Sequence, residues 1–165
     1  MSDRWKAMAG QLRIGVISDT HGRLDAAVRR YFAGVDHIIH AGDVGVQQVL
    51  DELATLAPVT AVAGNMDAGE LRQRLPEEAS GQVRGVRFLV GHKQRRLLQQ
   101  HTDPAREGYD LVVIGHTHVA FADWHNGVLY LNPGTAAAPE PGDRPTVAVV
   151  EVDVDGLDPH IIDLD

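Results

Sequence analysis

The chain has 165 residues, of which 44% are hydrophobic and 23% are charged, and it contains no cysteine. This length suits a single domain, and the lack of cysteine excludes disulfides, thiolate metal sites and thiol redox chemistry. The net charge of −8 argues against extended nucleic-acid binding. No apolar run is long enough for a membrane span or a signal peptide, so we expect a cytoplasmic protein. We expect one domain over 1–165 with an N-terminal extension over 1–11.

Strand patterns alternate with helical patterns in the first half of the chain. Apolar runs predict strands over 12–17, 35–39 and 59–63. Between them, apolar residues at helical spacing predict two helices, with stripes formed by Leu24, Ala27, Val28 and Tyr31, and by Val46, Val49, Leu50 and Leu53. This alternation predicts an α/β fold with a parallel sheet and right-handed crossovers.

The second half is richer in strand patterns. Residues 83–90 predict one strand broken at Gly85 or a pair of strands, 94–100 a helix, and 111–114 a short buried strand. Asn126-Gly127 between the runs 121–125 and 128–131 predicts a type I′ hairpin. Valines alternate with acidic residues over 150–155, which predicts a half-solvated antiparallel strand and a terminal β-meander. We expect two stacked sheets with helices outside.

Oxygen and imidazole donors follow five of these apolar runs. They are Asp19-Thr20-His21, Gly42-Asp43, Gly64-Asn65-Met66-Asp67, His92, and Gly115-His116-Thr117-His118. Such donors suit borderline or hard divalent metals, and together they are enough for two ions. Two adjacent ions can activate water for attack on a phosphate ester, so the pattern predicts a binuclear metallohydrolase.

The spacing of the donors indicates how the ions are held. Asp19 and His21 are two residues apart, as are His116 and His118, so in extended backbone each pair points one way and can chelate one ion. Asp43 is the natural bridging carboxylate between two ions that repel each other. Asn65 supplies a neutral oxygen, and its amide could orient the attacking hydroxide. We expect manganese or iron, with zinc, cobalt and nickel as alternatives.

The remaining polar residues have weaker assignments. The five other histidines are expected on the surface or in hydrogen bonds, and they are His37, His40, His101, His125 and His160. Asp67 could hydrogen-bond a ligand imidazole or cap its own loop. Lys93, Arg95 and Arg96 could bind phosphate, although the favoured interpretation is that they form the solvated face of a helix.

The chain resembles the calcineurin-like metallophosphoesterase superfamily, and specifically its small single-domain bacterial and archaeal phosphodiesterases. The resemblance covers nearly the whole chain and rests on residues 14–21, 40–43, 64–67, 115–118 and Asn132-Pro133-Gly134-Thr135. It implies a four-layer αββα sandwich and hydrolysis of a small phosphodiester by in-line attack of metal-bound hydroxide. It also implies one metal on Asp19, His21, Asp43 and His118, and a second on Asp43, Asn65, His92 and His116.

Two positions depart from the family pattern. Lys93 follows His92 where the family usually has glycine. Met66 stands where the wider superfamily often has a histidine that protonates the leaving group, and methionine cannot donate a proton, so a diester with a weakly basic leaving group is expected. The alternative is a non-catalytic protein-binding scaffold of the same fold, but the complete set of donors favours an enzyme. The sequence leaves a homo-oligomer open.

Overall fold

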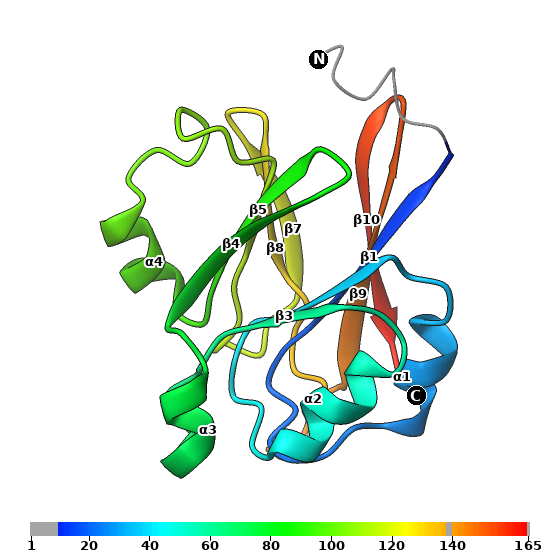
Figure 1. Cartoon of the computed structure of the whole chain (residues 1–165), viewed down its shortest axis with the longest axis vertical. Helices are drawn as coiled ribbons and strands as arrows, with labels where there is room; N and C mark the ends of the chain where they lie inside the picture. The colour runs from blue at the N-terminus through cyan, green and yellow to red at the C-terminus, as the bar shows by residue number, and fades with distance from the viewer. Residues whose placement is uncertain (1–9, 138–139, 165) are drawn as a thin grey trace.

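Two five-stranded sheets form the centre of the protein (Figure 1). The computed structural model describes residues 10–137 and 140–164; residues 1–9 of the predicted N-terminal extension lie outside this part. The first sheet has the order β10-β9-β1-β2-β3 and the second the order β4-β5-β6-β8-β7. Helices lie on the outer sides of both, so the predicted αββα sandwich is confirmed.

The first sheet combines a parallel part with a terminal hairpin. Strands β1 (Leu12–Ile17), β2 (His37–His40) and β3 (Val59–Ala61) pair in parallel, while β9 (Thr146–Asp153) and β10 (Gly156–Asp163) add antiparallel beside β1. Helices α1 (Ala26–Tyr31) and α2 (Gln47–Ala54) connect the parallel strands, as the sequence predicted. Asp25 begins α1, because its carboxylate accepts a hydrogen bond of 2.8 Å from the Ala27 N–H.

The second sheet has a parallel centre with antiparallel edges. Its strands are β4 (Glu78–Val83), β5 (Val86–Gly91), β6 (Leu111–Val113), β7 (Phe121–His125) and β8 (Val128–Asn132). β5, β6 and β8 run parallel, with β4 and β7 antiparallel at the two edges. Helix α4 (Gln94–Gln100) covers its outer face, and α3 (Gly69–Arg74) lies between β3 and β4 in the chain.

The main core lies between the sheets. Alternate residues of β1, namely Leu12, Ile14 and Val16, are fully buried and share one cluster with Val90 and Val113 of the second sheet. This is the period of two that a strand imposes on its faces. A second cluster lies under α1 and α2, and a third under α4. Both sheets are therefore covered on both faces, and this packing holds in place the edge at which their strands end.

The hairpin predictions are confirmed, whereas the prediction for the end of the chain is wrong. Residues 83–90 belong to a strand pair whose turn, Arg84-Gly85, has φ values of 46° and 90°. Asn126-Gly127, with φ values of 51° and 79°, forms the predicted hairpin. The terminal meander was wrong, because β7 and β8 join the second sheet whereas β9 and β10 join the first. β9 shows the predicted alternation over 150–153, where Glu151 and Asp153 are more exposed than the valines, but 146–149 are buried on both faces, because the second sheet covers one face and helices cover the other.

Some elements differ at their ends or were not predicted. Val46 precedes α2 and is 46% exposed, so it does not belong to the buried stripe. Val154 lies in the turn after β9 and is 52% exposed. Helix α3 and strand β10 were both missed. Within the described ranges, no helix combines the length and apolarity needed to cross a membrane.

Candidate metal centre

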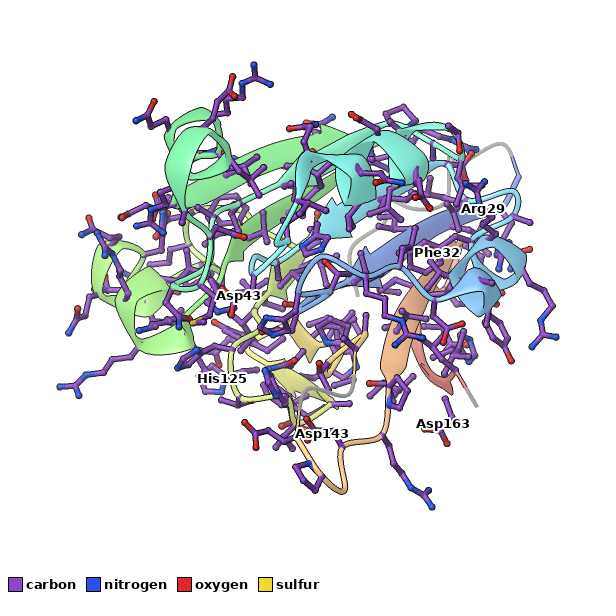
Figure 2. The ribbon with its side chains drawn as sticks, turned by 90° about the horizontal axis from the view of Figure 1, so that it is seen from below. Arg29, Phe32, Asp43, His125, Asp143 and Asp163 are labelled. Atoms are coloured by element: carbon purple, nitrogen blue, oxygen red, sulfur yellow. The ribbon has the colours of Figure 1, made fainter. Side chains whose placement is uncertain are left out.

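The predicted donors gather at one edge of the sandwich. The carboxyl ends of β1, β2 and β3 lead into Asp19, Asp43 and Asn65, and those of β5 and β6 lead into His92 and His116. In Figure 2, Asp43 lies between the green segments, which include α4, and the blue segments, which include α1. The centre is thus built from both sheets.

The first cluster of donors is formed by Asp19, His21 and His118. Asp19 Oδ1 is 3.8 Å from His21 Nε2 and 3.3 Å from His118 Nε2. Asp19 Oδ1 and His21 Nε2 are buried and have no hydrogen-bond partner. The other oxygen, Oδ2, accepts hydrogen bonds from Ser18 Oγ at 2.6 Å and from the His116 N–H at 3.2 Å. Because an unpaired buried polar atom is costly, a cation bound here would satisfy both orphaned atoms.

The second cluster is formed by Asn65, His92 and His116, with Asp43 beside them. Asn65 Oδ1 is 2.9 Å from His92 Nε2 and 3.1 Å from His116 Nδ1. His92 Nδ1 donates a hydrogen bond of 2.7 Å to the Ala41 carbonyl, so in the neutral ring the lone pair of Nε2 faces Asn65 Oδ1. Two acceptors at this distance require a proton or a metal between them, and the same tautomer suits metal ligation.

Asp43 connects the two clusters. Ligand atoms of Asp19, Asp43 and His92 all lie within 4.8 Å of one another. Asp43 Oδ2 is 3.3 Å from His92 Nε2, and Oδ1 accepts a hydrogen bond of 2.8 Å from the Met66 N–H. Donors from both sides therefore converge on this one carboxylate, so the residues present suit a pair of ions with Asp43 between them.

The ligands have unusual backbone conformations. Among the described residues, seven that are not glycine have positive φ, and five of these are predicted ligands: Asp19 (57°), His21 (47°), Asp43 (53°), His116 (71°) and His118 (62°). The prediction of extended backbone was therefore wrong. The left-handed turn at His116 sends the rings of His116 and His118 to different clusters, so they do not form one chelating pair. Such strain is typical of sites that the surrounding structure enforces.

Two glycines leave room for the carboxylates. A Cβ at Gly64 would stand 2.1 Å from Asp43 Oδ1, and a Cβ at Gly115 would stand 2.2 Å from Ser18 Oγ and 3.0 Å from Asp19 Oδ2. The motifs Gly64-Asn65 and Gly115-His116 need glycine because neighbouring loops touch their backbone.

The pKa values of the donors are shifted in different directions. Burial alone would raise the pKa of Asp43, but hydrogen bonds from His92 and the Met66 N–H lower it to about 2. Burial raises the pKa of Asp19 despite the hydrogen bond from Ser18. Burial would lower the pKa of His92, but the hydrogen bond to Asp43 and the charge of Asp19 raise it. Burial and the neighbouring His92 lower the pKa of His116, which keeps its imidazole neutral.

Comparison with known proteins identifies the family. The family model described as the calcineurin-like phosphoesterase superfamily domain matches residues 12–155. This chain belongs to that superfamily. As a calcineurin-like phosphoesterase it is a hydrolase, and the family uses metal ions. A probable metallophosphoesterase from Methanothermobacter thermautotrophicus is 38% identical over 90% of this chain and 91% of its own length. Phosphodiesterase YfcE from Escherichia coli K12 is 29% identical over 87% of this chain and 89% of its own length.

Solved structures share the fold of this calcineurin-like phosphoesterase. A novel archaeal phosphodiesterase is 25% identical, with a TM-score of 0.74 over 92% of this chain and 99% of that one. Vacuolar protein sorting 29 from Cryptosporidium parvum is 20% identical, with a TM-score of 0.72 over 94% of this chain and 98% of that one. At this identity the second likeness concerns the fold alone.

His40 and Asp67 hold the loops of the phosphoesterase together. His40 is fully buried; its Nδ1 accepts from the Gly42 N–H at 3.1 Å, and its Nε2 donates to Thr20 Oγ1 at 3.0 Å. Burial lowers the pKa of His40 to about 3, so it stays neutral. Asp67 accepts from the Gly45 and Gly64 N–H groups at 2.9 and 2.8 Å, which is loop capping rather than contact with an imidazole. Sequence reasoning gave His40 no specific role, although its place in His-Ala-Gly-Asp was a usable signal.

The basic run lies at the rim of the centre. Lys93 and Arg95 are exposed and line a hollow with Gly115 and His116, which would let them reach a phosphate. Arg96 instead forms an ion pair with Glu77. The remaining histidines lie away from the donors. His37 hydrogen-bonds Thr60, His101 lies between two glutamates, His125 packs on Tyr130, and His160 is beside Glu151 and Asp158.

Proposed function

We propose that this protein hydrolyses small phosphodiesters with two divalent ions, manganese or iron above others. The observation that carries the proposal is the convergence of seven predicted ligands into two clusters joined through Asp43. The first ion would be held by Asp19, His21, Asp43 and His118, and the second by Asp43, Asn65, His92 and His116. When bound, such ions lower the pKa of water and neutralise charge on the phosphoryl group.

The chain supplies the groups that orient the reaction. With a pKa near 2, Asp43 stays a carboxylate at any working pH and can serve both sides of the centre. Asn65 directs Oδ1 toward His92 and His116, which leaves its amide nitrogen to hydrogen-bond the attacking oxygen or a phosphate oxygen. Asn65 and His116 are exposed whereas Asp19 and Asp43 are buried, so the substrate enters from the side of the former pair.

The preference for a diester comes from the lack of a proton donor at residue 66. Met66 is 66% exposed beside the centre, where it can contact a leaving group but cannot protonate it. Lys93, on the rim, can attract the phosphate anion. We also infer that residues 1–165 act as one domain in the cytoplasm, and that extended nucleic acid is not a substrate because the net charge is −8.

A protein-binding scaffold is the second candidate. Val46, Met66 and Val119 are each at least 46% exposed, and each belongs to a loop of the metal centre. Exposed apolar side chains gathered around a site favour contact with a partner protein. The complete set of donors supports the enzyme instead, because a scaffold does not need them.

Metal reconstitution with paired variants tests the proposal. The purified protein is stripped with chelator, reloaded with single metals, and assayed with bis(p-nitrophenyl) phosphate and with the monoester p-nitrophenyl phosphate. Asp43→Asn and His116→Ala should abolish diester hydrolysis while the circular dichroism spectrum stays unchanged. His160→Gln, on the exposed β10, is the matched control and should keep full activity. Full activity in both ligand variants would refute the metal mechanism, and an inactive, metal-loaded wild type would favour the scaffold.

A further inference from the structure

A groove leads from the metal centre along the outer face of the second sheet. Its near part, beside His116, is lined by Lys93 and Arg95, and its far part by Phe121, Asp123 and Tyr130. Gln94 and Leu98 of α4 line both parts, so the two adjoin each other. The far part has a volume of about 620 Å³, which is ample for a small organic group.

The register between β7 and β8 places the far part of the groove close to the loop of His116. Phe121, at the start of β7, pairs with Asn132 of β8. Asn132 Nδ2 donates hydrogen bonds to the Gly115 carbonyl at 3.0 Å and to Thr117 Oγ1 at 3.1 Å, so this end of β7 adjoins the loop of His116. Phe121 and Asp123 share one face of β7, about 7 Å apart along the strand. A substrate arm that extends from the loop of His116 along this face would therefore pass Phe121 before it meets Asp123.

The charge along the groove changes sign. Lys93 and Arg95 make the near part basic, whereas the far part contains the carboxylates of Asp103 and Asp123 beside two aromatic rings. Asp103 Oδ2 lies 3.5 Å from Nε of the exposed Arg106, which offsets part of its charge. Asp123 has no hydrogen bond or ion pair with any side chain that the structure describes, so its charge is available to a ligand. Burial and the Asp103 carboxylate raise the pKa of Tyr130.

We propose that this groove holds one ester arm of the substrate and that the arm ends in an organic cation, a primary or quaternary ammonium. The inference rests on the phosphodiesterase function proposed above and specifies its substrate class. A zwitterionic diester matches the groove, because its phosphate meets the basic part and its ammonium meets the carboxylates. The rings of Phe121 and Tyr130 add attraction for a cation over their faces. An anionic arm would be repelled by Asp103 and Asp123.

A pair of substrates that differ only in charge tests this specificity. p-Nitrophenyl phosphocholine has a quaternary ammonium, and p-nitrophenyl 3,3-dimethylbutyl phosphate is its neutral carbon isostere with the same leaving group. We expect the manganese-loaded wild type to favour the cationic diester by about fivefold in kcat/KM. Asp123→Asn should shift this ratio toward one by lowering kcat/KM for the cationic diester. Asp155→Asn, in the turn between β9 and β10, removes the same charge elsewhere and should leave the ratio unchanged.

The outcomes separate this inference from the proposed function. Equal rates for both diesters in the wild type, or an unchanged ratio in Asp123→Asn, overturn the inference and leave the phosphodiesterase intact. If neither diester is hydrolysed, the proposed function fails, and binding then decides the inference through titration with tetramethylammonium followed by NMR of the Tyr130 ring. Shifts that disappear in Asp123→Asn support a cation site. Absence of shifts in the wild type overturns it.

Discussion

Replacement of Gly64 by alanine probes the metal centre without removing a ligand. The new Cβ would stand 2.1 Å from Asp43 Oδ1 and 2.3 Å from the Asp43 backbone nitrogen. Neither distance is tolerable, so the carboxylate and its loop must move by about 1 Å, a displacement that can cost about a hundredfold in rate. Overpacking of this kind also destabilises a fold by about 1–3 kcal/mol.

Gly64→Ala is therefore expected to lose diester hydrolysis by at least about a hundredfold and to bind manganese more weakly. Calorimetric titration gives the affinity, and urea unfolding with and without manganese gives the stabilisation by metal, about 2.7 kcal/mol at a hundredfold excess over Kd. Gly81→Ala is the control, because its Cβ would stand 2.7 Å from Phe88 Cζ in the β4–β5 hairpin. It should lose stability but keep its metal. Wild-type activity and affinity in Gly64→Ala would refute the role assigned to Asp43.

Three further results are expected. The pKa of His40 is about 3 in the folded protein and about 6.5 in the unfolded chain, so the free energy of unfolding should fall by about 1.4 kcal/mol per pH unit as the pH decreases from 6.5 toward 3. His40→Gln should flatten this slope in urea unfolding. An unchanged slope in the variant would contradict the role of His40. Protonated His101 donates from Nδ1 to Glu107 at 2.6 Å and from Nε2 to Glu78 at 2.9 Å, and the Glu107 hydrogen bond raises its pKa. Its stabilisation is thus complete below about pH 6.5 and lost as pH rises through the raised pKa, so His101→Gln should lower stability only on the acidic side. Asp67→Ala leaves the Gly45 and Gly64 N–H groups without their carboxylate and should cost about 3 kcal/mol, measured by urea unfolding; a loss below about 0.5 kcal/mol would mean that water replaces the carboxylate.

The order of strands and donors could be predicted from the sequence for a simple reason. Carboxyl ends of parallel strands meet at one edge of a sheet, so Asp19, Asp43 and Asn65 had to lie near one another once 12–17, 35–39 and 59–63 were recognised as strands. The same applies to His92 and His116 in the second sheet. This inference needs only the alternation of apolar runs with helices.

Backbone conformation at the donors could not be predicted in this way. Positive φ at His116 results from tertiary contacts, among them the hydrogen bond from its N–H to Asp19 Oδ2, which is far away in the chain. A partial signal existed, because aspartate and histidine are enriched among non-glycine residues with positive φ. Strand β10 was missed because Pro159 argues against a strand, yet β10 is an edge strand, where proline is tolerated.

Because the donors lie on two different sheets, the packing between the sheets sets the distance between the donors. Ile14 and Val16 on one side, and Val90 and Val113 on the other, supply no donor, yet their bulk fixes how far apart the two sheets stand. Since close-packed interiors transmit strain, a change of volume in this layer alters the relative positions of the donors. Aliphatic residues that supply no donor thereby set the separation between the donors of the two sheets.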